Sequence, residues 1–330
     1  MNTKRWLAIV AAGLLLFVSI GFQLVTSALS GALDGAFSID EGIFDETVIA
    51  EGNPNERIAV LSLDGVIQDN VATGVFGDDY YNQFLSSIDR AAEDTTVKAI
   101  ILKVNSPGGG VVESAEIHRQ LVALKEETKK PIFVSMGNTA ASGGYYVSAP
   151  ADKIYAEAAT ITGSIGVIMQ SINFGKFAEK HGVEFDTITS GKHKDIMSPA
   201  REMTNEEEEI LQTMVDEMYD DFVQVIVDGR GMKEDKVREL ADGRVYTGKQ
   251  AKENNLIDEV GTFEDALLDL QETEELTNAQ IFEYGQKQIF LNAFLMDAKN
   301  IFKSEEGQLI ELITSLGQSE NPRAMYLYAN

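Results

Sequence analysis

The chain has 330 residues, enough to bury a full hydrophobic core, and a formal net charge of −26. This acidic balance argues against nucleic acid and against an anionic membrane surface as the main partner. Because the chain has no cysteine, disulfides, thiol nucleophiles and thiolate metal sites are excluded. Only three histidines occur, and none belongs to an HExxH pattern, so a zinc enzyme is not expected.

The N-terminus carries the clearest topological signal. Residues 6–28 contain no charged side chain and are long enough to cross a hydrocarbon core of about 30 Å. Lys4 and Arg5 precede this run, and the positive-inside rule keeps residues 1–5 in the cytoplasm. A cleaved signal peptide is the alternative, but its apolar run usually has only ~7–15 residues. We therefore predict an uncleaved single-pass anchor in the cell membrane, with the rest of the chain on the extracytoplasmic side.

Residues 29–57 are rich in Gly, Asp and Glu and show no sustained periodicity, which predicts a juxtamembrane linker. From Ile58 onward, apolar strand patterns alternate with helical patterns. Strands that are apolar throughout and are separated by helices are typical of a parallel sheet covered on both faces. We predict one α/β domain over residues 58–290 and a tail segment over 291–330. Strands are expected at 97–107 and 131–137, and helices at 80–94 and 111–130.

The part of the chain after Pro199 is dominated by helical patterns. Thr204 and Glu207 form a capping box. Apolar residues then recur at helical spacing from Leu211 to Ile226, which indicates a helix that packs on the core or on another subunit. Further helical patterns, at 233–243, 247–256 and 262–275, complete a helical C-terminal extension.

The segment NSPGGGV, Asn105 to Val111, places three glycines between a strand and a helix. Glycines let the backbone turn with positive φ and leave N–H groups accessible to a ligand, and the first turn of a helix adds free N–H donors. Such a loop suits an oxyanion hole or a phosphate site, although the nucleotide P-loop pattern is not met. A tight turn without a function is the simpler alternative.

A second motif, TAASGGY, surrounds Ser142. Small neighbours let a substrate carbonyl reach the hydroxyl and an N–H group together, although the motif is not the GxSxG of other hydrolases. A serine nucleophile also needs a base. The segment SGKHKDIMSPAREMT supplies Lys192, His193 and Lys194, and a lysine can act as a base when burial lowers its pKa. Spacing does not choose among these three, and taken alone the serine fits a structural role and the loop a solvated basic surface.

Four segments, in this order, resemble the signal peptide peptidases of the short bacterial SppA type. They are LKVNSPGGGVVESAEIH, AASGGYYVSAPADKIYAEAATITGSIGVI, SGKHKDIMSPAREMT and DGRVYTGKQAKENNLIDEVG. The resemblance runs from about Ile58 to Leu270 and includes the anchor and the segment PRAMYLYA near the end of the chain. It implies a Clp/crotonase-like fold, a spiral of repeated ββα units with a mostly parallel sheet. It also implies a serine/lysine peptidase that needs no cofactor and no metal.

The resemblance assigns roles to individual residues. Ser142 matches the nucleophile, Lys194 matches the general base, and Ser164 matches a serine that orients the lysine amine. Gly109 and Gly143 would supply the N–H groups of the oxyanion hole. The implied activity is that of an endopeptidase that degrades signal-peptide remnants and other apolar peptides at the bacterial membrane through an acyl-enzyme.

Two other enzyme classes remain open. A Ser-His-Asp hydrolase would use His118 or His193 as its base, and activity would then be lost when that histidine is replaced. A crotonase-like acyl-CoA enzyme would share the glycine loop, but its membrane anchor would be hard to explain.

The resemblance also bears on assembly. Relatives on this fold form rings, so we expect a ring-like homo-oligomer in which Ser142 of one protomer meets Lys194 of the next. The last residues, MYLYAN, follow the helix-breaking NPR and are apolar. They are therefore a candidate occupant of the protein's own groove, or a self-processing site.

Overall fold

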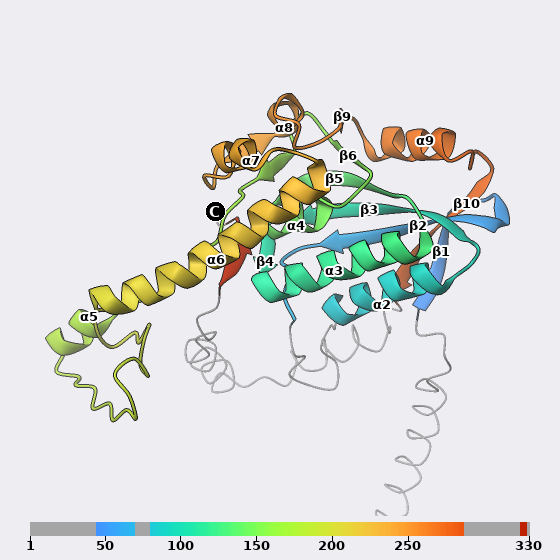
Figure 1. Cartoon of the computed structure of the whole chain (residues 1–330). Helices are drawn as coiled ribbons and strands as arrows, with labels where there is room; N and C mark the ends of the chain where they lie inside the picture. Colours follow the sequence, from blue (N-terminus) through green and yellow to red (C-terminus); the bar gives the residue numbers. More distant parts are fainter. Residues whose placement is uncertain (1–43, 70–79, 287–323, 329–330) are drawn as a thin grey trace, which may run out of the picture. The chain divides into compact units, whose positions relative to one another are not determined.

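The computed structural model describes residues 44–69, 80–286 and 324–328 (Figure 1). The predicted anchor at 6–28 and most of the tail segment at 291–330 lie outside the described residues. Within the described residues, no helix is both long enough and apolar enough to span a bilayer. The described residues from Glu46 onward belong to one compact unit, which contains the site discussed below.

A mostly parallel β-sheet of nine strands forms the centre of the described part of the chain. In spatial order its strands are β1 (Phe44–Ala50), β10 (Ala279–Gln286), β2 (Asn53–Asp64), β3 (Val97–Ser106), β5 (Ile132–Ala141), β6 (Lys153–Ala156) and β9 (Glu259–Val260). Strands β10 through β9 pair in parallel. Beyond the end of β5, β7 (Ile161–Gly163) pairs with β5 in parallel and with β8 (Val245–Thr247) in antiparallel. The predicted α/β class with a mostly parallel sheet is confirmed.

Alternate residues of the central strands pack into two separate cores, one on each face of the sheet. In β2, Ala59 and Leu61 belong to one core, whereas Ile58 and Val60 belong to the other. This is the period of two that a strand imposes on its side chains. The first face is covered by α2 (Tyr80–Glu93), α3 (Val111–Thr128), α4 (Gly143–Ser148) and part of α6 (Asn205–Arg230), and the second by α9 (Phe263–Thr273) (Figure 1).

Most predicted elements are present close to their expected bounds. Helices α2 and α3 fall within the predicted helices, and β3 is the predicted strand at 97–107. Strand β5 continues beyond the expected end at residue 137 as far as Ala141, so it leads directly into Ser142. The other helices of the described part are α5 (Gly175–Lys180), α7 (Glu234–Leu240) and α8 (Gly248–Glu253).

The structure differs from the prediction at the N-terminal side of the domain. Strand β1 and the first residues of β2 lie within the range 29–57 that the composition predicts as a linker. Arg57 forms ion pairs with Glu46 and, at 3.4 Å, with Asp94, and its guanidinium lies 3.6 Å from the ring centroid of Phe282. These partners come from three other segments of the chain. Local composition therefore does not reveal that the charge of Arg57 is paired.

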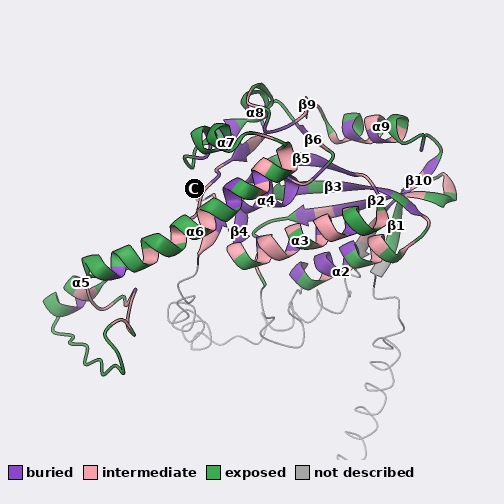
Figure 2. Cartoon of the chain, viewed as in Figure 1, coloured by how far each residue is buried: buried purple, intermediate pink, exposed green. Residues whose placement is uncertain are grey.

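Helix α6 packs on the rest of the domain, through α4 and α7, at only one of its ends. It has 26 residues, a length of about 39 Å, and it begins with the predicted capping box of Thr204 and Glu207. Its core contacts come from Phe222, Val223 and Ile226, whereas most of its first half is exposed (Figure 2). Helix α5 and its loops lie at the end remote from α4 (Figure 1). The apolar stripe predicted from Leu211 is therefore core only in its last part.

Candidate active site

Ser142 lies at the junction between β5 and α4, where the chain turns sharply. Its backbone angles are φ 53° and ψ −116°, a region that glycine adopts much more readily than serine, and such strain costs about 1–3 kcal/mol. The residue is 1% exposed, and its Oγ has no hydrogen-bond partner among the described residues. Its N–H donates to Gly163 O at 2.7 Å. The turn is therefore held from β7, while the hydroxyl is left without a partner.

The three glycines of the NSPGGGV segment form a short strand beside this turn, β4 (Gly108–Gly110). Gly108 has φ 97°, and a Cβ on it would lie 2.6 Å from Gly143 N. A Cβ on Gly143 would in turn lie 2.6 Å from the hydroxyl of Ser114, which is fully buried on the first turn of α3. The two backbones approach so closely that neither position has room for a side chain. This contact brings the N-terminal end of α4 against the glycine strand.

Residues near the end of the chain occupy the other edge of the glycine strand. Strand β11 (Met325–Leu327) pairs with β4 in antiparallel, with Tyr326 opposite Gly109. Met325 also exchanges two backbone hydrogen bonds with Ile168, each of 3.0 Å. The segment is thus held as an extended strand between two backbones, beside the turn that carries Ser142. That this place is the substrate groove stays a prediction.

The pairing places a carbonyl of the tail against the glycine loop. Tyr328 N donates to Pro107 O at 2.7 Å, and Val111 N donates to Ala324 O at 3.4 Å. Hydrogen-bonded pairs alternate along an antiparallel ladder, so the pair between these two, Tyr326 with Gly109, is also hydrogen-bonded. The N–H of Gly109 therefore faces the carbonyl of Tyr326. A Cβ on Gly143 would lie 3.1 Å from the same carbonyl oxygen.

The side chain of Tyr326 fills an aromatic subsite. Its ring lies 4.9 Å from the ring of Tyr146, in a stacked arrangement, and 4.7 Å from the ring of Phe222. Its hydroxyl donates to Met218 O at 2.9 Å, and burial raises its pKa above the usual value for tyrosine. Sequence reasoning assigned no role to Tyr146 and placed Phe222 only in an apolar stripe. Neither residue type carries a signal that distinguishes a subsite wall from ordinary core.

The predicted site residues are only partly brought together within one chain. Ser164 directly follows Gly163, whose carbonyl accepts the N–H of Ser142, so Ser164 lies beside the turn. Lys194 is exposed, in the loop between α5 and α6. The residue before it, His193, lies 3.3 Å from Glu206 in the first turn of α6.

The length of α6 separates Lys194 from Ser142. Phe222, the α6 residue that packs on Tyr146 of α4, lies about 24 Å further along the helix than Glu206, at a rise of about 1.5 Å per residue. A lysine side chain cannot span such a distance. Ser142 and Lys194 of the same chain are therefore apart.

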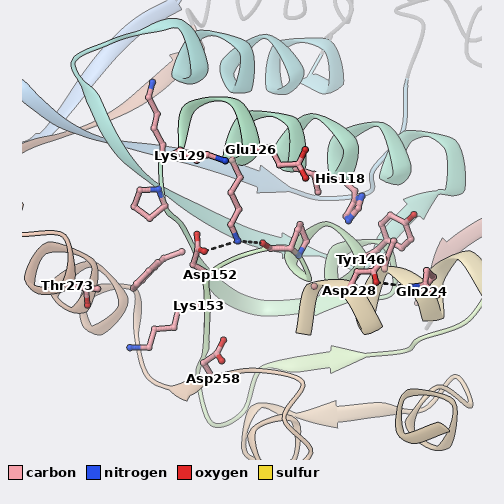
Figure 3. A pocket seen from close by; sticks show the side chains of 18 of the residues that line it. His118, Glu126, Lys129, Tyr146, Asp152, Lys153, Gln224, Asp228, Asp258 and Thr273 are labelled. Atoms are coloured by element: carbon pink, nitrogen blue, oxygen red, sulfur yellow. Dashed lines mark hydrogen bonds and ion pairs between the residues drawn. The ribbon is translucent and has the colours of Figure 1, made fainter. Parts of the chain in front are cut away.

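A pocket of about 1170 Å³ lies near α4 but does not include Ser142 (Figure 3). Half of its 20 lining residues are Lys, Asp or Glu, and Lys125 pairs there with Asp152 at 2.8 Å. His118 also lines it and contacts the ring of Tyr146 edge-on. Burial lowers the pKa of His118 below its ordinary value, which keeps the imidazole neutral at pH 7. The lining of the pocket includes neither the glycine strand nor β11, but Tyr146 both lines the pocket and stacks on Tyr326.

The fold is α/β, and the site combines a strained serine, whose hydroxyl has no partner among the described residues, with an extended strand that lies beside it. These features fit a hydrolase. Comparison with known proteins agrees, since residues 124–277 match Peptidase family S49. The chain is 41% identical over 344 aligned residues to a protein of Enterococcus faecium provisionally named signal peptide peptidase SppA, and 99% of each chain is covered. It is 37% identical over 229 residues to Protease 4 of Haemophilus influenzae, which covers 68% of this chain and 36% of that protein. The chain therefore belongs to the SppA-type peptidases of family S49 and is a serine peptidase.

Proposed function

We propose that this chain is a membrane-anchored endopeptidase that degrades signal-peptide remnants and other apolar peptides outside the cytoplasmic membrane. Ser142 is the nucleophile, Lys194 is the general base, and Ser164 orients the lysine amine. The anchor at 6–28 keeps the enzyme at the membrane, where its substrates remain after preproteins are cleaved. The domain has the Clp/crotonase-like spiral of ββα units, with its helical C-terminal extension.

The observation that carries this proposal is the tail strand itself. An extended peptide lies between β4 and Ile168 with one carbonyl facing the N–H of Gly109. The turn at Ser142 lies at the same place, because Gly108 and Gly143 are in close contact. Backbone hydrogen bonds on both edges bind a peptide in a way that depends little on its sequence, which suits a peptidase that degrades varied remnants.

The chemistry follows from these positions. Neutral Lys194 takes the proton from Ser142 Oγ, which attacks the carbonyl carbon, and the N–H groups of Gly109 and Gly143 stabilise the oxyanion. The lysine ammonium then protonates the leaving amine, which departs with the C-terminal fragment and leaves an acyl-enzyme. Water, deprotonated by the same lysine, attacks the ester and releases the N-terminal fragment.

Within this proposal, Lys194 comes from a second copy of the chain. The distance along α6 keeps the two residues of one chain apart, and large apolar side chains are exposed on the segment around α5. Ile172 is 76% exposed, Phe177 is 67% exposed and Ile188 is fully exposed. Such apolar exposure is typical of a surface that another protein covers. A ring-like homo-oligomer would bury it and would bring Lys194 of one protomer to Ser142 of the next.

The two other enzyme classes gain no support from the described residues. Ser142 Oγ has no hydrogen-bond partner there, so neither His118 nor His193 of the same chain is in place to act as its base. The groove beside the serine holds an extended peptide strand, which favours a peptide over an acyl-CoA as the substrate.

A serine-reactive fluorophosphonate tests the nucleophile. Peptide mapping should locate the label on Ser142, and Ser142→Ala and Lys194→Ala should each abolish peptide hydrolysis. His193→Ala should keep most of the activity. Turnover by Lys194→Ala at close to the wild-type rate would exclude the serine/lysine mechanism.

Complementation tests the shared site. The inactive Ser142→Ala and Lys194→Ala proteins are unfolded together, refolded as a mixture and assayed. Sites that combine an intact serine with an intact lysine from two chains should restore activity in the mixture, but in neither parent. Mixed oligomers that form, as verified by two affinity tags, yet remain inactive would place both residues in one chain.

A further inference from the structure

Three charged residues and one threonine form a hydrogen-bonded cluster directly after Lys194 in the chain. Arg201 Nε and Nη2 donate to the two carboxylate oxygens of Asp195 at 2.7 and 2.8 Å. Arg201 Nη1 and Nη2 donate to the two oxygens of Glu207 at 2.8 and 2.6 Å. Thr204 N also donates to Glu207, at 3.0 Å. One guanidinium therefore forms two bidentate carboxylate pairs, the most directional arrangement available to an arginine.

This cluster links the lysine loop to the rigid end of α6. Glu207 is the capping-box residue of that helix, and its side chain is only 2% exposed. Asp195 adjoins Lys194 in the chain, so the guanidinium fixes the backbone next to the lysine. The first turn of α6 therefore sets the position of Lys194, and the helix sets the position of that turn relative to the core.

The two carboxylates need the arginine between them. Without a cation, Asp195 and Glu207 would repel each other, and Glu207 would be a buried charge without a cationic partner. The hydrogen bonds from Arg201 lower the pKa of both carboxyl groups, so both stay ionised at neutral pH. Removing the guanidinium should therefore loosen the loop next to Lys194, while the capping box and the contacts of Lys192 and His193 with Glu206 remain.

We propose that Arg201 is a positioning residue for the general base: it locks the loop that carries Lys194 onto the first turn of α6, so that the lysine reaches the serine of the neighbouring protomer in the geometry that catalysis needs. The proposal rests on the shared serine/lysine site proposed above. Arg201, in the SPAREMT segment, contacts neither the tail strand nor Ser142, and the proposal gives it a role.

The described part of the chain offers a matched control. Arg238 also bridges two carboxylates, Asp220 and Glu234, each at 2.8 Å, and its side chain is 38% exposed against 34% for Arg201. It joins α6 to α7, far along the helix from the lysine loop. Arg201→Gln and Arg238→Gln therefore each remove an arginine that bridges two carboxylates, although only the bridge of Arg201 includes a buried one, Glu207.

The test places Arg201→Gln in one or the other partner of the complementation mixture, using full-length protein in detergent. The Ser142→Ala chain supplies the intact Lys194 of the restored site. Arg201→Gln in that chain should therefore lower the restored activity by roughly 10- to 100-fold, since a misplacement of about 1 Å can cost that much. The Lys194→Ala chain supplies only the serine of the restored site. Arg201→Gln in that chain should therefore leave the restored activity within about twofold of that of the parent mixture. Arg238→Gln should have no effect in either chain. Equal losses in the two placements, or no loss in the first, would overturn the proposal.

A second measurement separates this proposal from the shared site. If the parent mixture is inactive, the two-chain site is wrong, and Arg201→Gln is then assayed in the otherwise intact chain. Positioning predicts a lower kcat with an unchanged KM, and partial recovery in Arg201→Lys, which keeps the charge but not both bidentate pairs. A kcat within about twofold of wild type would reject the positioning role whatever the origin of the lysine.

Discussion

At the residue scale, the proposed nucleophile combines backbone strain with an unpaired, buried hydroxyl. Ser142 holds φ 53° and ψ −116°, and its Oγ has no partner among the described residues. Each feature costs about 1–3 kcal/mol in a folded protein. Both features are explained if a substrate carbonyl must reach the Ser142 hydroxyl at this turn while two backbone N–H groups bind the carbonyl oxygen.

Two substitutions of Ser142 should distinguish the role of its hydroxyl in the reaction from the backbone strain of the turn. Ser142→Ala should abolish hydrolysis and leave the thermal midpoint within a few degrees of wild type, because it removes a hydroxyl that has no partner. Ser142→Gly should also be inactive, but more stable than Ser142→Ala by about 1 kcal/mol, since relief of strain outweighs the extra freedom of glycine in the unfolded chain. Denaturant unfolding measures both, and a glycine variant less stable than the alanine variant would show that the turn is not strained.

The lysine base predicts a pH dependence of the rate. A lysine removes a proton only in its neutral form, and a lysine in water has a pKa of about 10.4. Hydrolysis of an added peptide should therefore become faster from about pH 7 to about pH 9. Ser164→Ala should lower the rate at each pH, by roughly 10–100-fold as for other groups that orient a ligand. A rate that fell between about pH 6 and pH 8 would contradict a lysine base.

At the element scale, a single lysine holds the C-terminal end of α2. Lys130 Nζ donates to the carbonyl oxygens of Ala91, Ala92 and Asp94 at 2.7 to 2.8 Å, and the residue is 9% exposed. The last carbonyls of a helix have no partner within the helix. Lys130, in the loop before β5, supplies the missing donors. It thereby fixes the end of α2 on the face of the sheet that also carries α3, the helix that follows the glycine strand.

Lys130→Met should therefore destabilise the protein by about 1–3 kcal/mol, because buried carbonyls lose their donors. Lys98→Met is the control: Lys98 also donates to a backbone carbonyl, that of Thr95, but from an exposed position. The control should change stability by less than about 0.5 kcal/mol. Chemical denaturation compares the two, and equal effects would show that Lys130 does not hold α2.

Under the proposed function, the tail strand lies where a peptide substrate would bind. Deleting residues 324–330 should therefore raise kcat/KM for an added peptide, mainly through a lower KM, because the peptide no longer competes with a segment of the same chain. Initial rates at several peptide concentrations measure this effect. An unchanged KM would mean that added peptides bind elsewhere.

The tail is also a possible substrate. Tyr326 presents its carbonyl to Gly109, so slow self-cleavage after Tyr326 should shorten the wild-type chain during long incubation. Intact-mass measurement should show this loss in wild type and not in Ser142→Ala. If both proteins keep the same C-terminus, the tail occupies the groove without being processed.

At the scale of the whole molecule, α6 carries a long, exposed arm away from the sheet (Figure 2). The apolar residues around α5 lie on this arm, together with the lysine loop. If a second copy covers them, assembly and activity should depend on the same surface.

Phe177→Asp should therefore lower both the size of the oligomer and the activity, because a charge would have to be buried at the interface. Leu268→Asp, at an exposed apolar position on α9, is the matched control and should change neither property. Analytical ultracentrifugation and a peptide assay give the two readouts. An intact oligomer with full activity in Phe177→Asp would show that this surface is not the interface.

Local patterns in the sequence determined the elements of this protein and several of its chemical groups. Strand β3, helix α3 and the capping box of Thr204 and Glu207 were predictable because period, composition and capping act within a few residues. The glycines at 108–110 and the small residues around Ser142 showed where two backbones come close. The serine/lysine assignment came from the resemblance, since spacing did not choose among Lys192, His193 and Lys194.

Only the tertiary structure decided how these parts meet. Three contacts join segments that are distant in the chain or separated by a turn. Strand β10 pairs in parallel with β2, the ring of Tyr326 packs against Tyr146 and Phe222, and Arg201 bridges two carboxylates. The length of α6 and its docking at one end set Lys194 far from Ser142 of the same chain. Such contacts arise from packing and charge pairing in three dimensions, which leave no periodic signal in the sequence, because each partner alone reads as an ordinary core or surface residue.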